Sequence, residues 1–97
     1  MLHTINKSPF QADSFTSCLR FAQAGDPILL IEDGIYAAQA GTKFESMLQT
    51  AIASNPIYVL SGDLAARGIT KTIEGVQLID YEGFVDLVEQ HQVNAWL

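Results

Sequence analysis

Short runs of apolar residues alternate with longer amphipathic stretches along this chain. Four of the runs predict strands, which cover Leu2–Asn6, Ile28–Glu32, Ile57–Leu60 and Val76–Asp80. The run from Ile28 is continuously apolar until its last residue, which is typical of a central parallel strand buried on both faces. This alternation predicts one small α/β domain over residues 1–97, in which a mainly parallel sheet is flanked by helices.

The stretches between these strands carry apolar residues at helical spacing. The first predicted helix begins at Asp13 or Ser14 and runs to about Gln23, and Gly25 follows its end. Two apolar stripes result: Phe15, Cys18, Leu19 and Ala22 in this helix, and Phe44, Met47, Leu48, Ala51 and Ile52 in the next. Both stripes indicate helices that pack one face on the sheet.

Two further helices and the tail complete the predicted fold. Ser61 is expected to cap a short helix that runs through Ala66. Asp80 is expected to cap a last helix, whose apolar residues Phe84, Val85 and Val88 turn inward. The tail 93–97 mixes a polar asparagine with Trp96, so we expect it to dock on the body of the domain.

The balance of residue types adds an expectation about partners. Hydrophobic residues make up 48% of the chain and charged residues 16%, whereas roughly 25% of an ordinary soluble domain is charged. Too little polar surface remains to cover the chain evenly. We therefore expect a large face that a partner covers, and self-association of the isolated chain.

The net charge narrows the kinds of partner. Eleven Asp and Glu against five Lys and Arg give a formal net charge of -6, which opposes contact with phosphate backbones and anionic lipids. We therefore expect no direct nucleic-acid binding and no membrane partner. The longest strongly apolar run, Pro27–Ile31, is too short to span a bilayer. A single cysteine and no signal-peptide pattern predict a reducing, cytoplasmic location.

Three loops are expected to meet outside the carboxyl ends of the strands, where open parallel sheets bind ligands. They are Asn6–Phe10, Asp33–Tyr36 and Ser61–Asp63. The residues of the second loop have a structural interpretation: Asp33 caps the following helix, and Gly34 permits a tight turn. The alternative is that this turn binds a small ligand. Lys7 is interpreted as a solvated lysine, with steering of a sulfur or phosphate anion as its alternative.

Several kinds of site are excluded by the residues present. His3 and His91 lie at opposite ends of the sequence, and no C-x-x-C or H-x-x-x-H spacing occurs. No G-x-G-x-x-G or G-x-x-x-x-G-K motif follows a strand, and no nucleophile elbow is present. We therefore expect no metal and no bound cofactor.

Cys18 is the one soft nucleophile and the candidate catalytic residue. As a thiolate it could attack the terminal sulfur of a partner and carry that sulfur as a persulfide, with Lys7 or Arg20 as electrostatic helpers. Its place on the apolar stripe beside Phe15 indicates instead a small buried hydrophobe. Both interpretations stay open at this stage. His3, on the first strand, is interpreted as a hydrogen-bonded structural histidine in preference to a base.

An ordered series of segments resembles the DsrH/TusB family of sulfur-relay proteins. The series consists of Met1–Phe10, Ser17–Arg20, Leu29–Ala38, Asp63–Gly68, Ile79–Val85 and Trp96. It covers essentially the whole chain in order. The resemblance implies a small DsrE-like α/β subunit.

By this resemblance, the chain joins sister subunits of the DsrE/TusD and DsrF/TusC types in a heterohexamer on which sulfur-carrier proteins dock. In the Tus branch the complex passes persulfide sulfur toward the 2-thio group of the wobble uridine in certain tRNAs. In the Dsr branch it serves dissimilatory sulfur oxidation. The best-established sulfur-bearing cysteine belongs to the DsrE/TusD sister, in a loop after one strand, and the comparable loops here contain Ser8, Asp33 and Ser61. A cysteine at the position of Cys18 occurs in DsrH-type members and is missing from some TusB-type ones.

Three functional hypotheses remain. The chain is a sulfurtransferase subunit that carries sulfur on Cys18, or an interaction subunit without its own catalysis that completes the complex. The third hypothesis is a free-standing binder of a small ligand at the Asp33–Gly34 turn. The position of Cys18 on an apolar face favours the interaction subunit, and the missing phosphate motif disfavours the ligand binder.

Overall fold

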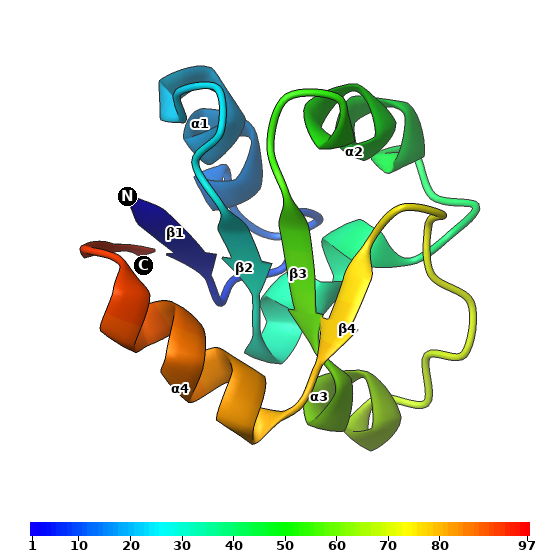
Figure 1. The fold of residues 1–97 in the computed structure, drawn as a ribbon. Coiled ribbons are helices and arrows are strands. Elements are labelled where there is room, and N and C mark those ends of the chain that lie inside the picture. Colours follow the sequence, from blue (N-terminus) through cyan, green and yellow to red (C-terminus); the bar gives the residue numbers. More distant parts are fainter.

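Five parallel strands form one sheet in the order β4-β3-β2-β1-β5 (Figure 1). The computed structural model describes all residues, 1–97. The strands are β1 (Leu2–Ile5), β2 (Ile28–Leu30), β3 (Ile57–Leu60), β4 (Gln77–Ile79) and β5 (Val93–Trp96). The predicted α/β fold with a mainly parallel sheet flanked by helices is confirmed.

The helices connect consecutive strands. They are α1 (Ser14–Phe21), the 3-10 helix η1 (Glu32–Ala38), α2 (Glu45–Ile52), α3 (Ser61–Ala66) and α4 (Tyr81–Gln90). From β1 to β4 each connection steps in the same direction across the sheet, and right-handed crossovers then put α1, η1, α2 and α3 on the same face. The connection from β4 back to β5 steps the opposite way, so α4 covers the other face (Figure 1).

The face under α1 and α2 holds the main core. Strand residues Ile28, Leu30, Ile57 and Val59 pack there in one cluster with Phe15, Cys18 and Leu48, and all seven side chains are fully buried. These helix residues come from the two predicted apolar stripes. The stripes therefore do what their spacing predicts, except that Met47 remains exposed.

The face under α4 is covered less completely. Leu2 and Leu29 on this face are fully buried, because β1 and β2 are central strands. However, no residue of α4 itself is buried, and Tyr81 and Val88 are exposed. Of the three residues predicted to turn inward, Phe84 and Val85 are half-buried, and the prediction is wrong for Val88, which is exposed.

The four predicted strands are present, Ile57–Leu60 with the predicted bounds and the other three one or two residues shorter, and the tail forms a fifth. Val93–Trp96 pairs with β1 in parallel, with Leu2 opposite Val93 and Ile5 opposite Trp96. Docking of the tail is therefore confirmed, and its form is an edge strand. The first and last strands of the sequence therefore lie side by side (Figure 1).

The predicted helix caps are correct at one helix only. Asp80 accepts a hydrogen bond from the Gly83 amide at 2.8 Å and caps α4 as predicted. Ser61 is wrong as a cap, because α3 begins at Ser61 itself and follows directly from β3. Asp33 is also wrong as a cap, because η1 begins at Glu32 and places Asp33 inside its first turn. Asp13 holds the cap position of α1 without a side-chain bond.

Gly34 is required by packing. A β-carbon at Gly34 would lie 2.1 Å from the backbone oxygen of Ile5, a separation that no side chain tolerates. The start of η1 therefore packs directly on the end of β1. This close approach fixes the loop after β2 against the carboxyl edge of the sheet.

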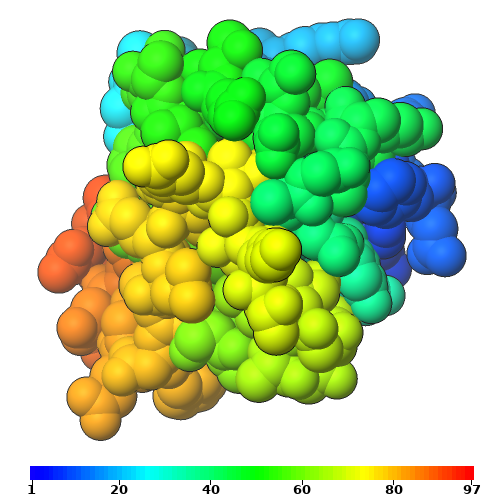
Figure 2. All heavy atoms as spheres, turned by 90° about the vertical axis from the view of Figure 1, so that its right-hand side faces the viewer, coloured from blue at the N-terminus to red at the C-terminus, as the bar shows by residue number.

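The β4 side of the molecule is covered by the segment that leads into that strand. Residues around 68–80 lie across the middle of this side, between α2 and α4 (Figure 2). Ile73 donates its amide to Ala38 and Ala40 donates to Lys71, so the segment is bonded to the end of η1. None of the helices combines the length and apolar character needed to cross a bilayer.

Candidate functional site

Cys18 lies in the middle of α1 with its side chain fully buried against the sheet. Burial, together with the smaller effect of the nearby negative charge of Asp26, raises the pKa of its thiol to about 12. A thiol in this state stays protonated at neutral pH and is a poor nucleophile. The interpretation of Cys18 as a buried hydrophobe is confirmed, and its role as a sulfur carrier stays a hypothesis.

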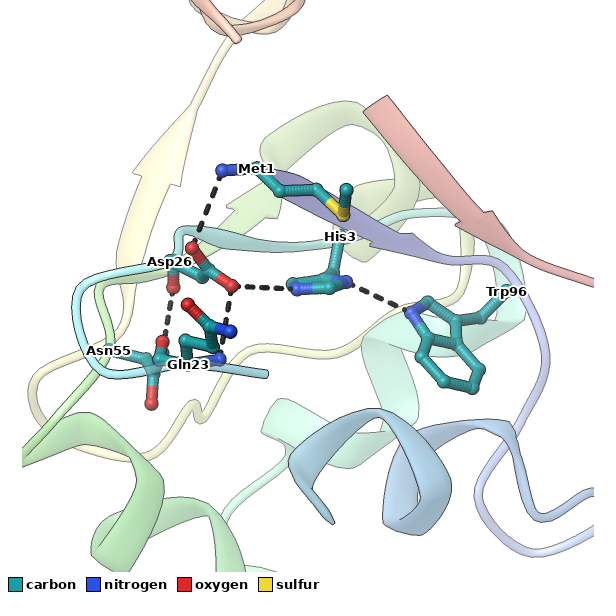
Figure 3. Close-up of polar contacts among 6 residues, drawn as sticks. All are labelled: Met1, His3, Gln23, Asp26, Asn55 and Trp96. Carbon is teal, nitrogen blue, oxygen red and sulfur yellow. Dashed lines mark hydrogen bonds and ion pairs between the residues drawn. The ribbon is translucent and has the colours of Figure 1, made fainter. Parts of the chain in front are cut away.

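His3 lies beside this region on β1, and it is fully buried with both ring nitrogens hydrogen-bonded (Figure 3). Its Nε2 lies 3.1 Å from Oδ2 of Asp26, and its Nδ1 lies 3.1 Å from Nε1 of Trp96. An indole N–H can only donate, so Nδ1 must be the acceptor and Nε2 carries the proton. His3 is therefore a neutral, satisfied structural histidine, as predicted.

Asp26 is the centre of this network, and it lies in the loop between α1 and β2. Its carboxylate accepts hydrogen bonds from the Gln23 amide at 3.0 Å, from His3 and from the amino group of Met1 at 3.3 Å. The backbone bond from Gln23, followed by the bond from His3, lowers the pKa of this carboxyl group. Asn55 extends the network, because its side chain donates to the backbone oxygens of Gln23 and Asp26.

A cysteine, a histidine and an aspartate thus come from one region, yet they do not form a catalytic triad. A triad needs the histidine to bond the aspartate through one nitrogen and the nucleophile through the other. Here the second nitrogen of His3 is bonded to Trp96, which leaves none for Cys18. The network can hold β1, β5 and the 23–26 loop together, and it cannot generate a thiolate.

Sequence reasoning missed Asp26 and Trp96 as partners of His3. Trp96 and His3 are 93 positions apart in the sequence, and no short motif connects them. A weak indication was available: a histidine in an apolar strand needs both a donor and an acceptor, and Trp96 is the single tryptophan.

The three predicted loops do meet at the carboxyl edge of the sheet. Ser8 and Phe10 of the first loop line a hollow with Asp33 and Tyr36 of the second, and an arginine that sequence reasoning missed connects the second loop to the third. Nε of Arg67 donates to Oδ1 of Asp33 at 2.9 Å, and its Nη1 lies 3.8 Å from Oδ1 of Asp63. The other oxygen of Asp63 accepts the Glu32 amide at 2.6 Å. The bond to Asp33 is the main cause that raises the pKa of Arg67. Asp33 and Asp63 therefore anchor loops to one another.

A shallow hollow of about 460 Å³ opens beside these loops, and it is lined by Ser8, Phe10, Gln11, Asp33 and Tyr36. Its single carboxylate is the one bonded to Arg67. Lys7 and Arg20 are exposed and enter no ion pair. Across the chain, no group of three or more His, Cys, Asp or Glu residues could hold a metal ion.

A larger groove of about 640 Å³ lies between α1 and α2 on the outer side of the core. Its apolar lining includes Leu19, Ala22, Met47 and Ala51, and Thr50 adds a hydroxyl. No charged residue lines it.

The comparisons with known proteins agree on one family. The family description "DsrH like protein" matches residues 7–94. Protein TusB from Escherichia coli K12 is 41% identical over 98 residues, which cover 99% of this chain and all of that protein. Protein TusB from Pectobacterium parmentieri is 43% identical over 99 residues with the same coverage.

Solved structures show the same fold. The ychN protein from E. coli superposes with a TM-score of 0.83 over 97% of both chains, at 18% identity. Protein Tm0979 from Thermotoga maritima superposes with a TM-score of 0.62 over 94% of both chains, at 26% identity.

Proposed function

The chain belongs to the DsrH family of sulfur-relay subunits, and from that premise we propose that it is an interaction subunit of a relay complex, without its own sulfur-bearing residue. The burial of Cys18 carries this proposal, since family membership leaves the carrier and the interaction hypotheses open. A carrier thiol must ionise and meet a docking protein. The thiol of Cys18 is fully buried, and its pKa is about 12.

We propose that the relay of which this subunit is part delivers persulfide sulfur toward the 2-thio group of the tRNA wobble uridine. The support is the Tus branch of the family, to which the full-length relatives at 41% and 43% identity belong by name. In this proposal the subunit pairs with DsrE/TusD-type and DsrF/TusC-type sisters in a heterohexamer in the cytoplasm. Its net charge of -6 opposes tRNA contact, so other members of the relay contact the tRNA.

Dissimilatory sulfur oxidation is the second candidate for the complex. The observation that favours it is Cys18, because a cysteine at this position occurs in DsrH-type members and is missing from some TusB-type ones. Both candidates give this chain the same local role. They differ in the final acceptor of the sulfur.

The experiment that tests the proposal compares two substitutions of Cys18 in the complex reconstituted with both sister subunits. Cys18→Ala removes the thiol and adds no polar group, whereas Cys18→Ser places a hydroxyl in the apolar site. We expect both variant complexes to transfer sulfur from a loaded upstream carrier at close to the wild-type rate. We also expect mass spectrometry to find no persulfide on Cys18 of the wild type.

Two outcomes would contradict the proposal. One is loss of transfer in a Cys18→Ala complex that remains assembled, as judged by size-exclusion chromatography. The other is a mass increase of one sulfur atom on Cys18 after incubation with the loaded carrier. Either result would make this chain a carrier.

A further inference from the structure

The hydrogen bond between His3 and Trp96 depends on the charge state of the histidine. Nδ1 of His3 accepts the indole N–H only while it has a free lone pair. A proton added at Nδ1 turns the acceptor into a donor, so two N–H groups would then face each other. Because His3 is fully buried, no solvent can take either hydrogen.

The side chains packed around His3 are two aromatic rings and one carboxylate, and the carboxylate is bonded to the other ring nitrogen. Phe21 of α1 meets the ring edge-on at 5.9 Å, and Trp96 lies at 6.2 Å, so aromatic rings enclose it. The titratable groups that face it are the Asp26 carboxylate, which is bonded to the opposite nitrogen, and the Met1 amino group on that carboxylate. From the neighbouring strands, Ile28 and Asn94 contribute no charge.

The strand that carries Trp96, β5, lies at one edge of the sheet. β5 has β1 as its one neighbour in the sheet, and Val93 is 42% exposed. The helix before it, α4, has no buried residue. Trp96 packs against the core and is bonded to His3, so it is the main side-chain attachment of β5.

We propose that His3 is a proton-sensitive latch for the C-terminal strand: neutral His3 holds Trp96 and keeps β5 on the sheet, and protonation at Nδ1 releases both. The proton comes from solvent and binds the Nδ1 lone pair, and the Trp96 N–H leaves for water. The released state binds one more proton than the closed state, so acid favours release. Release uncovers the outer backbone edge of β1, which is then free to pair with another strand.

Amide hydrogen exchange in the full chain tests this latch between about pH 8 and about pH 5, the range in which histidine gains its proton. Relative to the intrinsic exchange rate, protection of the β5 amides should fall by up to about tenfold per pH unit on the acid side, the slope of a one-proton reaction. Protection of β2 should stay constant. The emission of Trp96, the single tryptophan, should shift to the red together with β5 exchange.

Two substitutions and one matched control decide the cause. His3→Gln can accept from Trp96 and donate to Asp26 without titrating, so the acid response of β5 should disappear. Trp96→Phe removes the donor, so β5 should be less protected at neutral pH and no longer respond to acid in this range. His91→Gln, the same change at the other histidine, should leave the response intact.

The latch is overturned by any of three results. The wild type shows no acid response of β5, or β2 loses protection with the same slope as β5, which is global unfolding. The third is an acid response that persists in Trp96→Phe. Because Trp96→Phe keeps His3, this arm still decides the question if His3→Gln does not fold.

Discussion

The two faces of the sheet differ in how completely this chain covers them. On one face, α1 and α2 contribute Phe15, Cys18 and Leu48, all fully buried. On the other face, α4 contributes no buried residue, and its Tyr81 is 72% exposed. All three helices are amphipathic, so the difference comes from what they pack against and how closely. One face is closed by fully buried helix side chains, and the helix on the other face contributes none.

Exposed apolar side chains, however, occur on both sides of the sheet. They include Phe21 of α1 and Met47 of α2, and also Tyr81 and Val88 of α4 and Val93 of β5, the strand that follows this helix. The expectation of a partner-covered face arose from composition alone, and it stays a prediction. The structure adds that the α1 and α2 face has its core residues already buried by the chain itself.

The largest expected effect compares two aromatic residues in the first turns of the two opposing helices. Phe15→Ala should lower the free energy of unfolding by about 3–5 kcal/mol, because it empties a fully buried site. Tyr81→Ala should change it by no more than about 0.5 kcal/mol, because the ring is mostly in water. Urea unfolding followed by circular dichroism measures both. Equal losses would show that α4 packs as tightly as α1.

The second expected effect is a loss of stability at alkaline pH, caused by the Cys18 thiol on the α1 and α2 face. In the unfolded chain the Cys18 thiol ionises near its ordinary pKa of 9.0, and in the folded chain it ionises at about 12. The raised pKa means that stability is fully present below pH 9 and is lost as the pH rises toward 12. The loss from this group is about 1.4 kcal/mol per pH unit.

The matched control for this alkaline effect is Cys18→Ala. Tyrosines and lysines titrate in the same range, so the effect of Cys18 is the difference between the two pH profiles of urea unfolding. Parallel profiles for wild type and Cys18→Ala would mean that the thiol ionises freely in the folded chain. That outcome would also weaken the proposal that Cys18 carries no sulfur.

A third and smaller effect concerns a polar atom placed in the same site. Cys18→Ser should cost about 1–3 kcal/mol, since the hydroxyl enters an apolar environment. Native Cys18 should also react slowly with iodoacetamide at neutral pH, while the urea-unfolded chain reacts at the rate of a free thiol. Rapid alkylation of the native chain would show that α1 opens and exposes its inner face.

The smallest expected effect on stability concerns the incompletely covered face. Val88→Ser on α4 should lower the free energy of unfolding by no more than about 1 kcal/mol, because the side chain is 37% exposed and fills no fully buried site. We expect the isolated chain to self-associate, and this substitution to reduce the association seen by sedimentation velocity. If self-association is unchanged in Val88→Ser and in Tyr81→Ser, the surface through which the chain self-associates does not include α4.

The sequence was sufficient to predict the parts of the fold that depend on residues close together in the chain. The apolar runs gave β1 to β4, and the spacing of Phe15, Cys18 and Leu19 placed Cys18 on the buried side of α1. The cap at Asp80 was also predictable, because the residue stands alone before an amphipathic stretch. In these cases the structure is determined by residues within one or two turns of each other.

The missed features depend on residues that are far apart in the chain. Asp33, which its local sequence indicates as a cap, is bonded instead to Arg67, 34 positions away. The strand at 93–96 was not predicted as a strand, because its hydrogen-bond partner is the first strand of the chain. The bonds from Asp26 and Trp96 to His3 are of the same kind. Without an indication of which loops meet, a sequence pattern cannot assign such pairs.

The pairing of β5 with β1 also affects how the chain folds during synthesis. β1 leaves the ribosome before β5, so one edge of β1 stays unpaired while about 90 residues are added, on the order of ten seconds at typical elongation rates. Contacts that close so long a loop also slow folding. A nascent chain that lacks β5 therefore exposes an unpaired strand edge, which is a site for pairing with another strand.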